Sequence, residues 1–313
     1  IRTVSIPLNA SQTATPWQFT NVLSGYFGSV TAKYIFGYQK NEDRQFTSQL
    51  SIPLPVIIGL NDNETSLTTH EAQLLGTAFG ERLSWVTGLY SSASDVNNFN
   101  AYLLFAPVGT PHNVNTTQQT GGNTTTDSWA VYGQGTLAVT DRLNLTAGIR
   151  YTEDDVKTAQ FGFSPGLRCN LPAALPSVNI ATCTQRIAAQ TDAVTYNLSV
   201  DFKATEDVLL YATTRKGYNA GGFNANINDP DLEVVRPEFI TDYEAGLKAD
   251  WSLGSMPIRT NLSAFYAEYT DIQRTTSLLF QNLVVTGNFN AAEATIYGGQ
   301  IELLARPLEP LTI

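Results

Sequence analysis

The chain has 313 residues, a formal net charge of −10 and 15% charged residues, well below the ~25% usual for soluble domains. The excess of acidic over basic side chains disfavours nucleic acid as a partner, and none is expected. The nearest candidate for an apolar membrane segment, residues 52–60, falls far short of the ~18 residues that a membrane helix needs. The chain is therefore not expected to cross a membrane as helices.

Alternation of apolar and polar residues is the dominant pattern, and its period of two predicts β-strands rather than helices. In residues 142–156, for example, Leu143, Leu145 and Ile149 share one face, while Asn144 lies on the other. The same pattern recurs in residues 195–205, 242–251 and 295–307. We therefore expect an all-β fold.

The predicted strands are long, and the connections between them alternate between short and long. Residues 129–140 and 142–156 give strands of 12 to 15 residues, whereas strands of globular proteins have ~5–6 and a tilted strand crosses a bilayer in ~9–11. Tight turns are expected at residues 140–142, 205–207 and 253–257, and long loops at 96–126, 160–190 and 222–235.

Short turns at one end of a sheet and long loops at the other are typical of outer-membrane barrels. The sequence therefore predicts a transmembrane antiparallel up-and-down β-barrel, of which roughly a dozen strands are present. A soluble β-sandwich shows the same alternation of apolar and polar residues and is the alternative architecture.

The stretch YATTRKGYNAGGFN, residues 211–224, starts like a strand and contains three glycines. A phosphate-binding loop requires Gly-Lys-Ser/Thr followed by a helix, but here Lys216 precedes the glycines and a segment rich in Asn, Asp and Pro follows. We instead expect a strand that gives way to a long loop at Gly217. The glycines Gly217, Gly221 and Gly222 would permit bulges and positive φ there.

The sequence provides no pattern for a catalytic or metal site. His70, expected on a strand, and His112, expected in a loop, are far apart, so neither a His-centred triad nor a metal ligand set can be assembled. The acidic runs at 153–155 and 229–233 are expected to be solvated, with Ca²⁺ binding as the alternative. We expect no enzymatic activity, no metal and no cofactor.

Six stretches resemble the barrel strands of TonB-dependent outer-membrane receptors. One of them, RPEFITDYEAGLKADW, carries the family's Pro-Glu…Tyr-Glu-x-Gly-Leu-Lys pattern. Each stretch alone is short, but together they cover most of residues 82–313 in the order that the family has. In chain order they are residues 82–92, 128–156, 209–225, 236–251, 262–273 and 290–313.

The resemblance implies an energy-coupled importer of the bacterial outer membrane, with a barrel of about 22 strands closed by a plug. Residues 1–313 are then expected to be an internal part of one transmembrane barrel domain, without the plug or the C-terminal strands. The expected partners are outer-membrane lipid, the TonB energy-coupling complex acting through the plug, and a small ligand such as a ferric siderophore. Cobalamin or an oligosaccharide fits the sequence equally as cargo.

The resemblance also implies that ligand docks on the long loops and the polar upper interior, where five residues are candidate contacts. Ferric siderophores are often anionic, so Arg215, Lys216 and Arg236 are expected to attract the chelate. The rings of Tyr218 and Phe223 are expected to contact it. For the glycine-rich stretch that holds both rings, a purely structural bulge is the alternative.

Cys169 and Cys183 lie 14 positions apart in one predicted loop. We expect them to form a disulfide, because this loop would face the oxidising exterior of the cell. A metal-binding pair is the alternative, but no His or third Cys lies nearby.

Aromatic residues near the ends of predicted strands suit the membrane interface, where amphipathic rings settle; ordinary cross-strand packing is the alternative. These residues are Trp129, Tyr151, Trp251, Tyr266 and Tyr269. A soluble secreted β-protein that binds glycans is the alternative function, and a secreted β-rich hydrolase is a third. Strand length and the unequal ends of the sheet favour the barrel over both.

Overall fold

A computed structural model describes most of the chain. The described residues are 10–48, 57–104, 117–164, 166–171, 173, 175–224, 230–280 and 283–307. No helix within these ranges is long and apolar enough to span a membrane.

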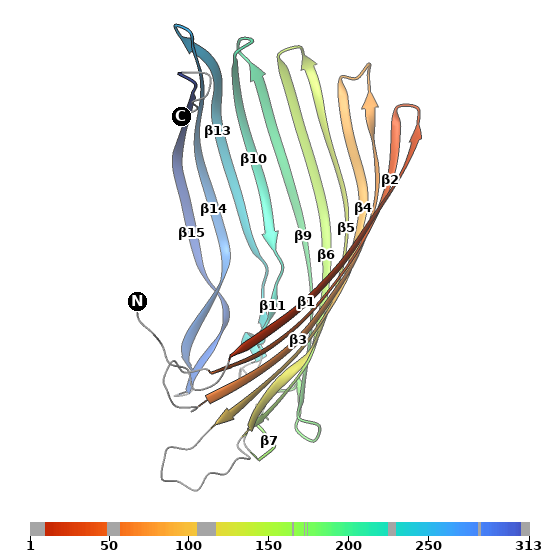
Figure 1. The fold of residues 1–313 in the computed structure, drawn as a ribbon, viewed down its shortest axis with the longest axis vertical. Helices are drawn as coiled ribbons and strands as arrows, with labels where there is room; N and C mark the ends of the chain where they lie inside the picture. The colour runs from red at the N-terminus through yellow and green to blue at the C-terminus, as the bar shows by residue number, and fades with distance from the viewer. Residues whose placement is uncertain are drawn as a thin grey trace.

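The fold is one large antiparallel sheet in which each long strand pairs with its neighbours in the sequence (Figure 1). The order is β1-β2-β3-β4-β5-β6-β9-β10-β13-β14-β15, with the short strands β7 and β8 pairing at the side with β6 and β9. A separate two-stranded sheet joins β11 to β12, and the 3-10 helix η1 lies between them in the sequence. The expected all-β, antiparallel up-and-down fold is confirmed.

The elements are β1 (Ser11–Phe27), β2 (Val30–Ser48), β3 (Ile57–Ala78), β4 (Leu83–Leu104), β5 (Thr117–Thr140), β6 (Leu143–Ser164), β7 (Arg168–Cys169), β8 (Val178–Asn179), β9 (Thr184–Lys203), β10 (Val208–Asn219), β11 (Gly222–Phe223), η1 (Pro230–Leu232), β12 (Val234–Val235), β13 (Glu238–Leu253), β14 (Met256–Phe280) and β15 (Leu283–Ala305).

The tight turns after β1, β3, β5, β9 and β13 lie at one end of the sheet, which we call the turn end (Figure 1). The opposite end is the loop end, which holds the long connections and also the short one between the paired ends of β14 and β15. The hairpins β1–β2 and β13–β14 turn at Gly28 and Gly254, where φ is 64° and 63°. A positive φ of this size is accessible to glycine without strain, so the sequence places glycine where the chain reverses most sharply. The expected asymmetry between short turns and long loops is therefore present.

The long strands exceed the expected 12 to 15 residues, because β3, β4, β5 and β6 have 22, 22, 24 and 22 residues. Much of the loop expected at 96–126 is strand, since β4 continues to Leu104 and β5 begins at Thr117. The β5 extension, residues 117–126, is rich in Thr, Asn and Gln and carries no apolar alternation, which hid it from the sequence pattern. The backbone ladder continues through this extension, and cross-strand bonds such as Asn123 Nδ2 to Asn97 Oδ1 at 2.9 Å reinforce it.

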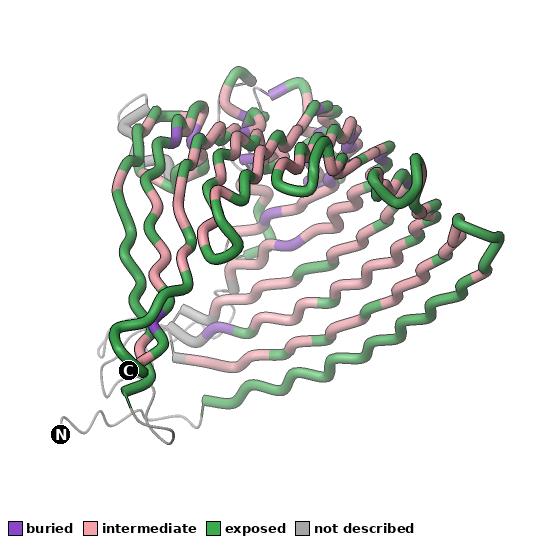
Figure 2. Tube along the Cα trace, turned by 90° about the horizontal axis from the view of Figure 1, so that it is seen from above, coloured by how far each residue is buried: buried purple, intermediate pink, exposed green. Residues whose placement is uncertain are grey.

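The two faces of the sheet differ in chemistry. Large apolar side chains on one face are exposed, among them Leu89, Ile149 and Leu198, with exposed fractions of 62%, 61% and 49%. We call this the outer face and the polar opposite side the inner face. Few residues are buried in the sheet as a whole (Figure 2), so the exposed apolar face needs another cover, and lipid is the cover that a barrel of this kind has.

Tyrosines mark one limit of the apolar band on the outer face. Tyr243, Tyr266 and Tyr297 lie directly opposite one another on β13, β14 and β15. Trp251, near the turn end of β13, is eight positions from Tyr243, which corresponds to ~27 Å along the strand. A strand tilted by ~35–45° converts this to ~19–22 Å of height, which approaches the ~25 Å of an outer-membrane apolar band. We take the part of each strand between these rings as the membrane-spanning part.

The expected interfacial position of Tyr269 is wrong, although Tyr266 does lie on the outer face. Tyr269 is three positions from Tyr266 and therefore points to the opposite face of β14, where it hydrogen-bonds Glu238. Period-two alternation explains the difference, because neighbours at odd spacing point to opposite faces of a strand.

Candidate ligand-binding wall

The inner face is concave, because side chains from strands that are not neighbours meet there. Tyr132 of β5 and Gln73 of β3 are separated by β4, yet Gln73 Nε2 donates a hydrogen bond of 2.9 Å to the Tyr132 hydroxyl. Gly88 of β4 lies beneath this contact, and a Cβ there would be 2.6 Å from the Tyr132 ring. A glycine in the middle strand therefore makes room for its neighbours to close over it.

A second bridge of the same kind lies next along the wall. Asn197 of β9 donates to Gln134 of β5 at 3.0 Å across β6, and the strand between them carries Gly148. A Cβ at Gly148 would overlap the Asn197 side-chain oxygen. The two bridges line the inner face with a continuous polar layer.

Arg150 is held in this layer by two aromatic rings. Its guanidinium lies 5.1 Å from the centroid of the Tyr90 ring and 5.8 Å from that of Tyr132, and its Nε donates to Thr152 Oγ1 at 3.0 Å. Tyr132 in turn donates its hydroxyl proton to Glu71. Guanidinium over aromatic faces is a favourable cation–π arrangement that leaves the ion's edge available for further hydrogen bonds.

Arg215 forms the centre of a second charged group farther along the wall. It donates to both carboxylate oxygens of Asp242, with Nε to Oδ1 at 3.0 Å, and to Glu244 Oε2 at 3.3 Å. The Tyr211 hydroxyl donates to the other Glu244 oxygen at 2.6 Å. One cation facing two carboxylates leaves this group with an excess negative charge, and Arg215 is half exposed, so the ion pairs themselves add little stability.

Tyr218 lies beyond the membrane-spanning part, since it pairs with Phe239, four positions past Tyr243. Its hydroxyl donates to the buried Asp154 carboxylate at 2.7 Å, and its ring stacks on Phe239 at 6.3 Å between centroids. Burial and the Asp154 carboxylate together raise the pKa of Tyr218 to about 12. Tyr218 is therefore a neutral hydrogen-bond donor at physiological pH.

The buried Glu238 joins three strands at the loop end. It accepts hydrogen bonds from the Gln273 backbone N–H at 2.6 Å and from Asn219 Nδ2 at 3.1 Å, and it also bonds Tyr269. Burial opposes ionisation, but these hydrogen bonds outweigh it and lower the pKa of the Glu238 carboxyl. The contact with Gln273 holds β14 in place where its pairing with β15 shifts register, between Tyr269 and Gln273. Asp271, within this irregular stretch, has a φ of 53°.

The five candidate contacts from the sequence are not gathered into one cluster. Arg215 and Tyr218 bond inner-face carboxylates, as described above. Lys216 instead shares a row with Tyr196 and Ile149 on the outer face, and its ammonium lies 4.9 Å from the Phe239 ring centroid. Phe239 is also the ring on which Tyr218 stacks, so Lys216 and Tyr218 meet at one aromatic side chain.

The other two candidate contacts lie in the connection between β10 and β13. Phe223 belongs to β11 and pairs with Val234 of β12. Arg236 is paired with Asp271 of β14, with Nη2 to Oδ1 at 2.7 Å. Asn290 of β15 donates from its amide to the backbone oxygens of Arg236 and Asp271. Arg236 is thus tied to the irregular part of the β14–β15 hairpin.

The glycines of residues 211–224 serve a different purpose from the one expected. The strand β10 runs through Gly217 and ends at Asn219, and positive φ occurs at none of Gly217, Gly221 and Gly222. Gly221 is needed for close approach, because a Cβ there would overlap the backbone oxygen of Val235. The expectation of positive φ is therefore wrong for all three glycines. Gly221 is required instead because β12 packs closely against this segment.

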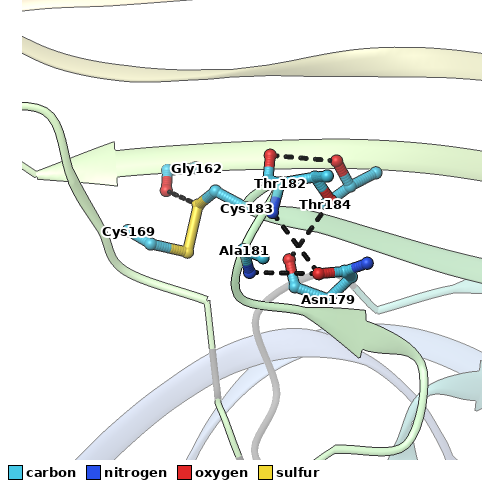
Figure 3. The surroundings of a disulfide bond; sticks show 7 residues. All are labelled: Gly162, Cys169, Asn179, Ala181, Thr182, Cys183 and Thr184. Atoms are coloured by element: carbon cyan, nitrogen blue, oxygen red, sulfur yellow. Dashed lines mark hydrogen bonds between the residues drawn. A yellow bond between two sulfur atoms is a disulfide. The ribbon is translucent and has the colours of Figure 1, made fainter.

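Cys169 and Cys183 form a disulfide, with their Cα atoms 5.5 Å apart (Figure 3). Cys183 is buried, and its sulfur lies 2.9 Å from the Gly162 backbone oxygen at the end of β6. Asn179 closes the neighbouring turn by accepting from the backbone N–H of Ala181 through its side-chain oxygen. The bond therefore ties the loop to the β6–β9 ladder.

The disulfide loop is also attached to the β11–β12 connection. Gln185, which is fully buried, donates to Glu233 Oε1 at 2.7 Å, and Ser177 donates to the same oxygen. Glu233 and Gln185 are 48 positions apart in the sequence. This contact joins two long connections into one ordered structure at the loop end.

Among the residues that the structure describes, no three His, Cys, Asp or Glu side chains are grouped to hold a metal ion. Within the acidic run 153–155, Asp154 points to the inner face and bonds Tyr218, whereas Asp155 accepts from Lys157. His70 lies on β3, as expected, and its Nδ1 is 2.7 Å from the Tyr34 hydroxyl. His112 lies outside the described residues.

The sequence analysis missed Glu71, Tyr132 and Arg150, which form much of the inner wall, and it expected Asp154 to be solvated, whereas Asp154 is buried. One signal was available for two of them. Counting outward from the tight turn at Asp141 places Tyr132 opposite Arg150, and this is the observed register. The partners on β3 and β4 could not be found in this way, because their register depends on connections whose geometry the sequence does not fix.

Comparison with known proteins agrees with this architecture. The family model described as TonB dependent receptor-like, beta-barrel matches residues 2–309. Among solved structures, the ferric yersiniabactin uptake receptor FyuA from Yersinia pestis superposes with a TM-score of 0.72 at 18% identity, over 95% of this chain and 40% of that chain. The siderophore receptor PiuA from Acinetobacter baumannii gives 0.65 at 15% identity, over 95% of this chain and 45% of that chain.

The copper transporter OprC is a further similar structure, with a TM-score of 0.65 at 10% identity, over 96% of this chain and 46% of that chain. At such identities the likeness shows the fold alone. The chain spans less than half the length of each of these three structures.

The family match covers nearly the whole chain and therefore decides between the function classes left open by the sequence. Members of this family are transport proteins of the Gram-negative outer membrane rather than enzymes, and a soluble glycan-binding protein is not favoured. The chain belongs to the TonB-dependent receptors and supplies strands of their outer-membrane β-barrel.

Proposed function

We propose that this chain is part of a single barrel domain in an energy-coupled receptor that imports a ferric siderophore. The observation that carries the proposal is the concave inner wall, where Arg150 and Arg215 present guanidinium groups among tyrosines. FyuA is a ferric yersiniabactin uptake receptor and PiuA is a siderophore receptor, which supports this class of ligand for a chain of the same fold.

The ligand is proposed to pass along the inner face, entering at the loop end. Arg215 and Tyr218 are the expected contacts that bond groups on this face, and Phe223 and Arg236 remain proposed contacts at the loop end. Lys216 remains a proposed contact beside Tyr218, because both side chains contact the Phe239 ring. The carboxylates beside Arg215 would suit a chelate whose hydroxyl or amide groups donate hydrogen bonds.

Energy for import is proposed to come from the TonB complex acting on a plug inside the complete barrel. In this arrangement the chain performs no chemistry and needs no cofactor. Its turn end lies in the periplasm and its loop end outside the cell, surrounded at the middle by outer-membrane lipid.

The experiment is uptake of radioactive iron by iron-starved cells whose only such receptor contains this chain. Catecholate, hydroxamate and carboxylate ferric siderophores are supplied separately, and uptake of one class is expected. Arg150→Ala and Arg215→Ala should each reduce that uptake, whereas Lys157→Ala on the outer face should not. Uptake of none of the three classes, or equal loss in all three variants, would contradict the proposal.

A further inference from the structure

A cavity of about 880 Å³ lies near the loop end of strands β1 to β6. Its lining includes Glu42, Asp62, Glu64, Asn97 and Asn123. In the register these residues belong to the same alternating set as the exposed Leu89 and Ile149, so the cavity opens on the outer face. It is therefore separate from the ligand-binding wall on the inner face.

The outer face is hollowed at this point because two aromatic rings approach across a strand. Phe99 of β4 and Phe161 of β6 are 6.4 Å apart between ring centroids, with β5 between them. Gly121 of β5 lies beneath the rings, and a Cβ there would be 2.9 Å from Phe161. The rings thus form an apolar wall beside otherwise polar side chains.

The charged groups of the cavity compensate one another in part. Lys40 bridges Glu42 and Glu64 at 2.8 Å each, and Arg44 pairs with Asp62 at 2.7 Å. Asp43 also lines the cavity, so two cations and four carboxylates leave two excess negative charges. A phosphate group is therefore not favoured in this cavity, whereas an uncharged polar molecule is not repelled.

The amides of the cavity are already ordered for hydrogen bonding. Asn97 and Asn123 both donate to Asp95 Oδ1, at 2.7 and 2.9 Å, and Asn123 donates to Asn97 as well. Fixed amides and carboxylates next to flat aromatic rings are suited to a sugar, which offers adjacent hydroxyls at its edge and C–H groups on its face.

The height of the cavity identifies the source of that sugar. Ser91 of β4 pairs with Trp129, and Asn97 lies six positions farther toward the loop end, ~20 Å along the strand. A strand tilted by ~45° converts this to ~14 Å of height above the Trp129 ring, whereas phospholipid headgroups add only ~5–8 Å to each side of the hydrocarbon core. Only a lipid with a long saccharide headgroup reaches the cavity from the membrane.

We infer that this outer-face cavity binds the saccharide of a glycolipid in the outer leaflet of the outer membrane. The inference uses the proposed orientation, in which the loop end is extracellular, but it does not depend on the imported ligand. The glycolipid would act as a lateral partner of the barrel and not as its cargo.

The test is thermal unfolding of the complete receptor in detergent, with and without purified lipopolysaccharide that carries its full core saccharide. Bound glycolipid stabilises the folded form by mass action, so the full-core molecule is expected to raise Tm. Lipopolysaccharide truncated to its innermost sugars should raise it less, because its headgroup ends below the cavity. The deacylated core saccharide should have a small effect, because it lacks the membrane anchor.

Matched variants locate the effect. Asn97→Ala with Asn123→Ala, and separately Phe161→Leu, should each remove most of the rise in Tm and the glycolipid that co-purifies, as counted by native mass spectrometry. Asn61→Ala, a change on the inner face that removes a bond to Gln45, should leave both unchanged.

An equal rise with full-core and truncated lipopolysaccharide, no rise with either, or the same rise in the double variant would overturn the inference. A deacylated saccharide as effective as the intact glycolipid would show a site for soluble sugars instead. Failure of iron uptake would leave this result unaffected, since the two surfaces lie on opposite faces.

Discussion

Individual residues on the strands are distinguished by the face on which they lie, and this gives a first prediction. Leu145 is 43% exposed on the outer face, while its neighbour Thr146 bonds Thr136 on the inner face. Leu145→Arg should cost ~2–4 kcal/mol of the free energy of unfolding, because the charge would face the membrane interior. Thr146→Arg should cost far less. Folding of the complete receptor into lipid vesicles, followed at increasing urea, measures both, and equal costs would refute the assignment of faces.

Tyr218 provides a residue-scale prediction about pH. Its pKa in the folded protein is about 12, against ~10 in an unfolded chain, because burial and Asp154 favour the protonated hydroxyl. A raised pKa means that its stabilisation is complete below pH ~10 and is lost as pH rises toward ~12. The ultraviolet difference titration of wild type against Tyr218→Phe should show one tyrosine ionising near pH 12. Ionisation near pH 10 would show that the bond to Asp154 is absent.

At the scale of the strands, the glycines of the inner wall are expected to be required for the bridges above them. Gly148→Ala should displace Asn197 and break its bond to Gln134, at a cost of ~1–3 kcal/mol. Every atom that the new Cβ meets belongs to a side chain, so the same change in an Asn197→Ala background should cost little. Gly133→Ala is the control, since its nearest atom is 3.8 Å away. Urea unfolding of the four variants measures the coupling, and additive costs would contradict it.

The elements themselves were predictable where apolar alternation was strong and where turns were tight. Residues 142–156 lie within β6, and the turn at Asp141 fixes the pairing of β5 with β6. The loop-end extension of β5 was not predictable, because Thr and Asn strands are held by backbone pairing and cross-strand amides rather than by an apolar face. The inner-wall contacts could not be predicted from the sequence for a different reason. Tyr132 and Glu71 are 61 positions apart, and their meeting depends on the registers of three strands together.

For the molecule as a whole, the remaining prediction is its orientation in the membrane. Antiparallel strands alternate in direction, so the tight turns after β1, β3, β5, β9 and β13 share one side, and the connections after β2, β4, β6, β10 and β14 share the other. We expect the turn end to be periplasmic, as short turns are in barrels of this type. Asn115 and Asn226, in the long loops expected at residues 96–126 and 222–235, are expected to face the outside but lie outside the described residues. We therefore test the loop end at Ala181 of the exposed disulfide loop.

The measurement is labelling of intact cells with a membrane-impermeant maleimide, in a complete receptor whose Cys169–Cys183 pair is replaced by serine. Ala181→Cys should be labelled, whereas Asp141→Cys and Glu206→Cys should be protected until the outer membrane is opened. All three positions are exposed in the folded chain, so protection reports the membrane and not burial. The reverse pattern would place the long loops in the periplasm. The entrance proposed for the ligand and the glycolipid cavity would then both face the wrong compartment.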